Sequence, residues 1–272
     1  MKKIELQLDE YLGEDGLAYC KNCHTARVCR IEGRYFPVNC KCRQEAYEKA
    51  EYERKLQERK AKAEEYRRNS ALGKHFRNCT FETAMIIPSN KAVYQMCQNY
   101  CAYADKMYDA GVGAYLYGVP GVGKTHLTAC MGNALADKLY TVLFTSFVEI
   151  ESKLKEGFGN NSAQSAVLRR AGTVDFLFLD DIGTENIKAG TGWLQTIAFD
   201  LINTRINGKK PTIYSSNYRI SALMANCNYE ERTAHRIRGS CLFEQQLDCE
   251  NMRDLILRQN RNNLMKFING GK

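Results

Sequence analysis

The stretch GVPGVGKT, residues 118–125, decides the fold of this chain. It follows the short apolar run Tyr115–Tyr117 and precedes HLTACMGNALADKLY, a helical pattern that begins at His126. Glycines at these spacings let backbone N–H groups wrap around phosphates at a helix N-terminus. In such a site Lys124 contacts the β- and γ-phosphates and Thr125 holds Mg²⁺. The pattern predicts a nucleoside triphosphate site formed by Gly118, Val119, Pro120, Gly121, Val122, Gly123, Lys124, Thr125 and His126.

Two further strands are predicted to end in polar residues. The buried run VDFLFL, residues 174–179, leads into Asp180 and Asp181, and TIYSS leads into Asn217. We expect Asp180 to anchor the hydration shell of Mg²⁺ and Asp181, with Asn217, to orient the attacking water. Strands separated by helices predict an α/β fold with a parallel sheet that is covered on both faces. Between these strands, apolar residues at helical spacing are expected in the core: Trp193, Leu194, Ile197, Ala198, Leu201 and Ile202.

Five of the 12 cysteines lie between positions 20 and 42, in the pattern C-x2-C, then 16 residues, then C-x-C. Two closely spaced thiolate pairs across a short loop are typical of a structural zinc site, and four thiolates leave no open position for catalysis. The predicted Zn²⁺ ligands are Cys20, Cys23, Cys40 and Cys42. Because the C-x-C pair is unusually tight, Cys29 or His24 is an alternative ligand. Tyr35 and Phe36 are expected to form the small core of this module.

The remaining cysteines are scattered along the chain. Without a secretion signal a disulfide scaffold is improbable, so we expect buried free thiols at Cys79, Cys97, Cys101, Cys130, Cys227, Cys241 and Cys249. Glu5, Asp9 and Glu10 stand where a signal peptide needs an apolar core, and no apolar run approaches the ~18 residues of a membrane helix. The composition, 44% hydrophobic and 26% charged with a net charge of +8, is typical of a soluble globular protein. We therefore predict a cytoplasmic protein that makes no contact with a membrane.

Residues 43–68, RQEAYEKAEYERKLQERKAKAEEYRR, contain no Gly or Pro and predict a charged helix. Glu and Lys recur at i,i+4 in the favourable order, at Glu45/Lys49, Glu51/Lys55 and Glu58/Lys62. Leu56 is the only large aliphatic residue, so a solvated spacer of roughly 40 Å is favoured over a coiled coil. The predicted domains are a zinc module at 1–42, a helical linker at 43–72 and a nucleotide-binding domain at 73–272.

The segments GVPGVGKTHL, FLFLDDIGTE, PTIYSSNY, ERTAHRIR and ENMRDL follow one another in this order. Together they resemble the AAA+ ATPases that load bacterial replicative helicases, the DnaC and DnaI type. The resemblance implies an AAA+ P-loop domain that hydrolyses ATP to ADP and phosphate and assembles as a homo-oligomer on single-stranded DNA. It also implies an N-terminal module that binds a hexameric replicative helicase.

Two other functions stay open. IstB-type transposition helper ATPases carry nearly the same motifs but act with a transposase on duplex DNA, and the cysteine module favours a loader over them. An adaptor that holds ATP without turnover is the second alternative.

The same resemblance assigns three residues outside the phosphate loop. Asn217 matches sensor 1, Arg253 matches sensor 2, and Arg236 matches the arginine finger that reaches the γ-phosphate of a neighbouring subunit. Arg232 and Arg238 flank Arg236 and are alternatives for the finger. The expected catalytic set is Lys124, Asp180, Asp181, Asn217, Arg236 and Arg253.

The chain departs from the family pattern at two places. Most AAA+ proteins carry Asp-Glu where this chain has Asp180-Asp181, so slow, assembly-dependent hydrolysis is expected. Only 19 residues follow Arg253, which predicts little or no C-terminal lid.

For single-stranded DNA, the segment VEIESKLKEGFGNNSAQSAVLRR offers cations for phosphate contacts and one ring for stacking. The alternative interpretation, which the sequence supports as well, is an amphipathic surface helix and loop with no role in DNA binding. The residues predicted to contact DNA are Lys153, Lys155, Phe158, Arg169 and Arg170.

Overall fold

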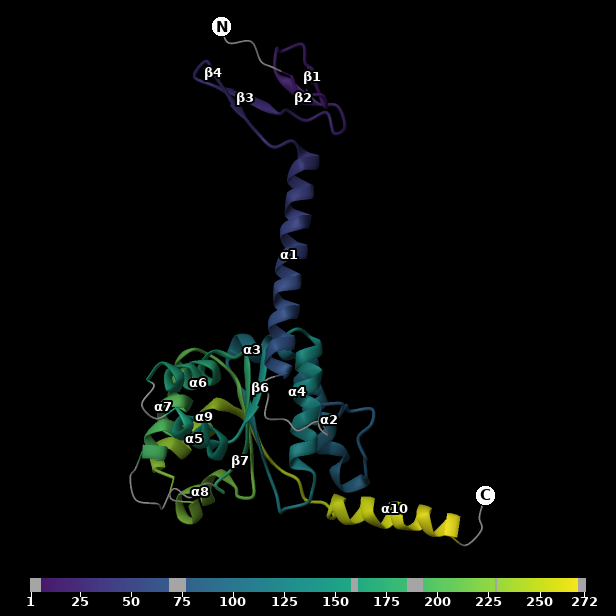
Figure 1. Ribbon diagram of the computed structural model, residues 1–272, viewed down its shortest axis with the longest axis vertical. Helices are drawn as coiled ribbons and strands as arrows, with labels where there is room; N and C mark the ends of the chain where they lie inside the picture. The colour runs from purple at the N-terminus through teal and green to yellow at the C-terminus, as the bar shows by residue number, and fades with distance from the viewer. Residues whose placement is uncertain (1–5, 69–76, 158–160, 185–192, 228, 269–272) are drawn as a thin grey trace. The chain divides into compact units, whose positions relative to one another are not determined.

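The chain folds into two compact units, Met1–Ala61 and Lys62–Lys272 (Figure 1). The computed structural model describes residues 6–68, 77–157, 161–184, 193–227 and 229–268. The domain limits predicted at residues 42 and 72 stay predictions, and residues 69–72 of the predicted linker lie outside the described residues.

Two antiparallel hairpins form the sheets of the N-terminal unit. The first pairs β1 (Glu10–Leu12) with β2 (Ala18–Cys20), and the second pairs β3 (Val28–Ile31) with β4 (Arg34–Pro37). Arg27 lies between them, and its backbone N–H donates to the β2 carbonyl of Ala18 at 2.7 Å. Both sheets are short, so the backbone pairing within each hairpin is limited. The segment around Arg27 adds a hydrogen bond to β2.

The interior of this unit is small and contains few apolar side chains. Ala18, Cys20 and Cys40 are buried, as is the side chain of Arg27. The expectation that Tyr35 and Phe36 form the core is wrong, because their side chains are 40% and 44% exposed. A unit with so few buried apolar groups requires another source of stability, which the cysteines offer.

The charged helix expected over residues 43–68 is present as α1 (Lys41–Arg68). Its side chains are mostly exposed, and ion pairs at i,i+4 join Glu51 to Lys55 at 2.7 Å and Arg54 to Glu58 at 3.2 Å. Ala63 is the buried residue of this helix. The pattern matches a helix stabilised by propensity and surface charge pairs rather than by an apolar seam.

A five-stranded parallel sheet forms the centre of the second unit, in the order β6-β7-β8-β5-β9. Alternate residues along the four strands β5 to β8 enter two separate cores, which explains why these strands are mostly apolar. In β7, for example, Phe176 and Phe178 join one core and Leu177 and Leu179 join the other. The strands are β5 (Gly113–Tyr117), β6 (Val142–Thr145), β7 (Phe176–Ile182), β8 (Thr212–Ser216) and β9 (Cys241–Gln246).

Helices cover both faces of this sheet, as Figure 1 shows. One face packs against α2 (Pro88–Ala102) and α4 (Lys124–Asp137), and α3 (Ala104–Ala110) follows α2 directly. The helices that follow β6, β7 and β8 contribute to the other core; they are α5 (Phe147–Glu156), α6 (Asn161–Thr173), α7 (Trp193–Asn207), α8 (Ile220–Cys227) and α9 (Glu231–Ser240). The α/β fold with a doubly covered parallel sheet is confirmed.

The expected core residues of α7 lie inside, since five of the six are buried and Trp193 is half-buried. Five of the seven scattered cysteines are buried as predicted, whereas Cys241 and Cys249 are only partly so. Within the described residues, β9 is followed by one helix, α10 (Met252–Ile268). No helix of the described chain is long and apolar enough to cross a membrane.

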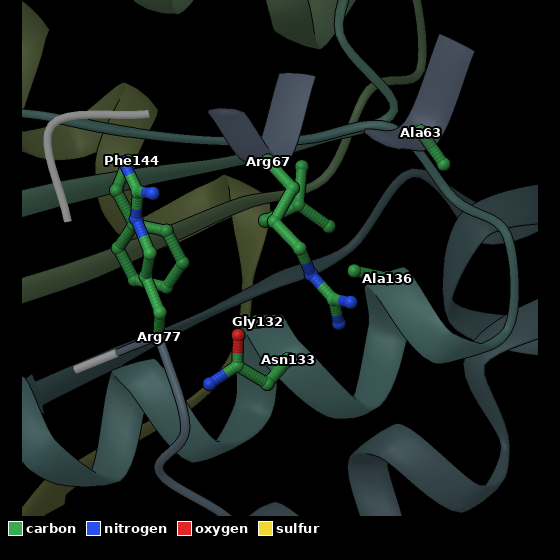
Figure 2. Close-up of a pocket in the computed structure, with 8 residues that line it drawn as sticks. Ala63, Arg67, Arg77, Gly132, Asn133, Ala136 and Phe144 are labelled. Atoms are coloured by element: carbon green, nitrogen blue, oxygen red, sulfur yellow. The ribbon is translucent and has the colours of Figure 1, made fainter. Parts of the chain in front are cut away.

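The last turns of α1 belong to the second unit and line a small pocket there (Figure 2). Arg67 reaches over α4 and pairs with Asp137 at 2.7 Å, and Arg77 lies on another wall of the pocket. Gly132 and Asn133 line it from the C-terminal half of α4, whereas the predicted phosphate loop precedes the N-terminus of that helix. The pocket is therefore separate from the predicted nucleotide site.

Candidate nucleotide and metal sites

The phosphate loop joins β5 to the N-terminus of α4, as the sequence predicted. Gly121 and Gly123 have φ values of 92° and 93°, a left-handed conformation that favours glycine. At Gly118 a Cβ atom would lie 2.4 Å from the carbonyl oxygen of Leu247. The loop therefore needs its glycines both for backbone conformation and for the close passage of the segment that follows β9.

Lys124, at the first position of α4, is 7% exposed and points back into the loop. Its ammonium donates to the carbonyl oxygens of Gly118 at 2.8 Å and Val119 at 3.2 Å, and to Oδ1 of Asn217 at 2.8 Å. Burial lowers the pKa of Lys124, and the nearby charges of Asp181 and Asp180 oppose that shift. A buried cation held by neutral acceptors is poised for a ligand that brings negative charge.

Thr125 and Asp180 lie side by side, although 55 residues separate them in sequence. The Thr125 hydroxyl donates to the Asp180 carboxylate at 3.0 Å, and the hydroxyl of Ser215 on β8 donates to its other oxygen. Hydroxyl and carboxylate oxygens are the ligands that Mg²⁺ prefers. The donor set of Thr125 and Asp180 therefore fits this ion.

Asp180 and Asp181 lie within β7, because the strand continues to Ile182 through a register shift. The φ of Asp181 is 56°, and its backbone N–H donates to the Ser215 hydroxyl at 2.9 Å. The Asn217 amide donates to the Asp181 carboxylate at 3.2 Å. Burial, followed by the charge of Asp180, raises the pKa of Asp181. The irregular strand thus places two carboxylates on the same edge as the loop.

The rest of the predicted loop divides into buried and exposed members. Val122 is 1% exposed, whereas Val119 is 63% exposed and Pro120 is also exposed. Nδ1 of His126 lies 3.2 Å from the Tyr94 hydroxyl of α2. Val122 therefore fixes the loop from inside, while Val119 and Pro120 present backbone and side chains to solvent.

Several residues at this site were not identified as site residues from the sequence. Ser215 bonds both Asp180 and the backbone of Asp181, and Tyr94 reaches His126 from α2. The backbone N–H of Met252 donates to the Gly121 carbonyl at 2.9 Å. The strand-end position of Ser215 is a signal that was present in the sequence, whereas Tyr94 and Met252 come from segments with no recognisable motif.

The three arginines of α9 differ in their surroundings. Arg232 pairs with Glu230 and lies over the ring of Phe199 at 4.5 Å. Arg236 and Arg238 are exposed, and neither forms an ion pair within the part of the chain that the structure describes. Arg253, also exposed, is in the first turn of α10, and its positive charge contributes to lowering the pKa of Lys124.

The cysteine cluster comes together as its spacing predicted. The Sγ atoms of Cys20, Cys23, Cys40 and Cys42 all lie within 4.8 Å of one another. Four sulfurs around a tetrahedral zinc at ~2.3 Å are about 3.8 Å apart, so the cluster fits this ion closely. The Nη2 atom of buried Arg27 lies 3.6 Å from Cys20 Sγ, where its charge stabilises a thiolate.

The two alternative ligands lie elsewhere. Nδ1 of His24 is 3.3 Å from the Tyr11 hydroxyl, and Cys29 pairs with Phe36 across the second hairpin. Neither belongs to the four-sulfur cluster.

The segment predicted to contact DNA is divided between α5 and α6. Lys153 and Lys155 pair with glutamates one turn away, at 2.5 Å and 2.7 Å. Arg169 is exposed, but Arg170 stacks over Tyr66 at 4.7 Å, with two of its nitrogens buried and without a hydrogen-bond partner among the described residues. Phe158 lies outside the described residues. Arg170 therefore serves the packing of α1 on α6.

This sheet order, phosphate loop and strand-end carboxylates define a P-loop ATPase of the AAA+ class. Residues 76–239 match the family model of the bacterial DnaA ATPase domain, and the chain belongs to this family. The resemblance to helicase loaders is also confirmed. The chain is 28% identical to the replicative helicase loader DnaI of Bacillus subtilis over 276 positions, which cover 93% of this chain and 84% of DnaI.

Other relatives match a smaller share of the chain. The replicative helicase loader DnaC of Escherichia coli K12 is 27% identical over 128 residues, which are 46% of this chain and 47% of DnaC. Among solved structures, a crystal structure of DnaI has a TM-score of 0.54 with 20% identity over 67% of this chain and 95% of the crystallised chain. A crystal structure of the DnaC helicase loader has a TM-score of 0.55 with 23% identity over 64% of this chain and 98% of that chain. These likenesses show that the fold is shared.

Proposed function

We propose that the chain is an ATP-dependent loader that places a hexameric replicative helicase on single-stranded DNA. The observation that carries this proposal is the extent of the similarity to DnaI, which covers 93% of the chain and therefore includes the cysteine cluster as well as the ATPase unit. The cysteine cluster favours a loader over a transposition helper. Both units then have a role, the first in binding the helicase and the second in binding nucleotide and DNA.

ATP binding is assigned to the phosphate loop and to Lys124. The β- and γ-phosphates replace the carbonyl acceptors that now hold the ammonium, because charged oxygens form stronger hydrogen bonds than neutral ones. Thr125 and Asp180 hold Mg²⁺, which supplies positive charge to the phosphate oxygens when bound. The loop from Gly118 to Gly123 directs backbone N–H groups at the same phosphates.

Hydrolysis is assigned to Asp181 and Asn217. Asn217 accepts a hydrogen bond from Lys124 and donates one to Asp181, which supports placing the attacking water beside these two residues. Asp181 is one methylene shorter than the usual glutamate, which favours a slow rate. Arg253 adds positive charge from within the subunit, and Arg236 of a neighbouring subunit completes the site, so hydrolysis depends on assembly.

The metal of the N-terminal unit is assigned as structural zinc on the four clustered cysteines. Their sulfurs leave no ligand position for water, and the unit has too small an apolar interior to fold by burial alone. Zinc thus supplies folding free energy to the module at residues 1–42, and residues 43–72 act as the helical linker to the AAA+ domain at 73–272.

The deciding experiment measures association of the full chain with the hexameric replicative helicase of the same host. We expect a complex at moderate salt that survives size-exclusion chromatography, and transfer of the helicase to single-stranded DNA in the presence of ATP. The test variant is Lys124→Ala, and the matched control is Lys91→Ala, which changes an exposed lysine of α2. Binding of the helicase by both variants, with transfer lost in Lys124→Ala alone, is the expected result. Absence of any complex contradicts the loader function.

A further inference from the structure

One face of the second hairpin of the N-terminal unit carries four apolar side chains and, at its end, Arg34. Cys29 is opposite Phe36, and Ile31 is opposite Arg34 in the β3–β4 register. Directly opposed residues of an antiparallel pair share a face, as do residues two apart on one strand. Val38, whose N–H donates to the Arg27 carbonyl, continues the same side. We call Cys29, Ile31, Phe36 and Val38 the hairpin face.

This face is open to solvent. Ile31 is 56% exposed, Phe36 44% and Val38 37%, and all four residues of β4 are exposed. A two-stranded hairpin is marginally stable by itself, and apolar side chains gathered on one face cost free energy in water unless something covers them. The four-cysteine cluster does not account for the apolar side chains of the hairpin face, because none of them, Cys29 included, belongs to that cluster.

Charge identifies the kind of surface that fits. Arg34 lies at the end of the hairpin face, and Arg30 is on the adjacent side over the ring of Tyr35 at 6.0 Å. Neither arginine has an ion pair among the residues that the structure describes, and Glu32 is the one acidic residue of the hairpin. Aromatic and arginine side chains around an apolar centre are typical of protein interfaces.

We propose that the hairpin face is the surface by which the N-terminal unit docks on the replicative helicase, in an apolar groove bordered by carboxylates. This inference rests on the proposed loader function and names the residues that carry its partner contact. A second copy of the chain is a poorer occupant. A symmetric pairing of this face would bring Arg30 and Arg34 of both copies together with little compensating charge.

The test compares two aspartate substitutions in the full chain. Ile31→Asp places a charge on the hairpin face, and Leu12→Asp places one on β1; both side chains are 56% exposed, so the two changes have matched cost to the free protein. Affinity for the purified hexameric helicase is measured by biolayer interferometry. We expect Ile31→Asp to weaken binding about 30-fold, the loss typical of an interface hot spot, and Leu12→Asp to leave it unchanged.

Further measurements separate docking from folding. Zinc content and ATP hydrolysis are measured for both variants, and Phe36→Ala provides a milder change of the same face. Loss of helicase binding with zinc retained supports the hairpin face. Equal binding by Ile31→Asp, Phe36→Ala and the unmodified chain overturns it while leaving the loader function intact. A change in self-association instead of helicase affinity also overturns it, in favour of a second copy. No binding by the unmodified chain removes the loader function itself.

Discussion

At the scale of single residues, the ammonium of Lys124 is held by its own loop and by Asn217. Two carbonyl oxygens and the Asn217 amide oxygen accept from the ammonium, and the other end of the Asn217 amide reaches Asp181. One amide therefore contacts both the group that binds phosphate and the group assigned to the water. Asn217 therefore connects the proposed phosphate contact of Lys124 to the proposed water contact of Asp181.

Asp181 leads to a prediction that combines stability with activity. Burial and the charge of Asp180 raise its pKa in the folded chain, so the folded state holds this proton more tightly than the unfolded state and the ionised carboxylate costs stability. The cost is complete above the raised pKa and disappears below the ordinary value of 3.8. We expect Asp181→Asn to raise the melting temperature at neutral pH, with the gain shrinking toward about pH 4.

The same substitution is expected to reduce ATP hydrolysis about 100-fold while leaving ATP binding intact, because a neutral amide orients the water less well. Asp200→Asn, which changes an exposed carboxylate of α7, is the matched control and should alter neither property. Thermal unfolding and phosphate release test both points. A lower melting temperature at neutral pH for Asp181→Asn would show that the carboxylate is stabilising and that the pKa argument is wrong.

At the scale of elements, one buried arginine joins the C-terminal end of α6 to the segments that lead into β7 and β8. Arg205 of α7 is 1% exposed and donates to the carbonyl oxygens of Ala171, Val174 and Pro211 at 2.6–2.9 Å. Its Nε atom also donates to the Thr212 hydroxyl at 2.8 Å. These bonds satisfy the end of α6 and the segments that precede β7 and β8, so both strands begin from a rigid edge. The carboxylates at their other ends are positioned by the same strands.

The four-cysteine cluster leads to a prediction at the scale of elements. Cys40→Ser removes one sulfur of the four-member cluster, and we expect the purified protein to lose its zinc and the hairpins to lose hydrogen-exchange protection. Cys29→Ser is the matched control and keeps one zinc per chain, because Cys29 is outside the cluster. Zinc content by atomic emission decides the matter. Loss of zinc in Cys29→Ser would instead make Cys29 the fourth ligand.

At the scale of the whole molecule, the two units differ in what stabilises them. The ATPase unit contains two extensive apolar cores, one on each face of its sheet, whereas the N-terminal unit buries few apolar side chains. We infer that the ATPase unit keeps its fold when zinc is removed. The proposed nucleotide binding and the proposed helicase binding can then be perturbed separately, as the substitutions above do.

The proposed arginine finger gives a prediction for the assembled protein. Lys124→Ala cannot bind ATP well but still offers Arg236, while Arg236→Ala binds ATP but offers no finger. Each variant alone should hydrolyse ATP at least about 1,000-fold more slowly than the unmodified chain. A mixture on single-stranded DNA should recover part of the rate, because a subunit of the first kind completes the site of the second. Arg238→Ala is the control and should retain activity; no recovery in the mixture contradicts a finger supplied in trans.

Much of the molecule was predictable from local patterns. The phosphate loop, the strand before the two aspartates, the helix from Arg43 to Arg68 and the four-cysteine cluster all depend on residues close together in sequence. Glycine spacing, apolar runs and thiolate pairs have strong local consequences, so the sequence by itself determined these elements and the class of chemistry.

Only the tertiary structure decided which distant residues meet. Ser215 bonds Asp180 because β8 lies beside β7, Asn217 reaches Lys124 because β8 also lies beside β5, and Arg170 is engaged because α6 packs on Tyr66. The exposure of Tyr35 and Phe36 likewise follows from how two hairpins pack, and composition favoured the opposite. Strand order, and the burial of side chains that no periodic pattern marks, arise from contacts between residues far apart in the chain, and local sequence does not encode them.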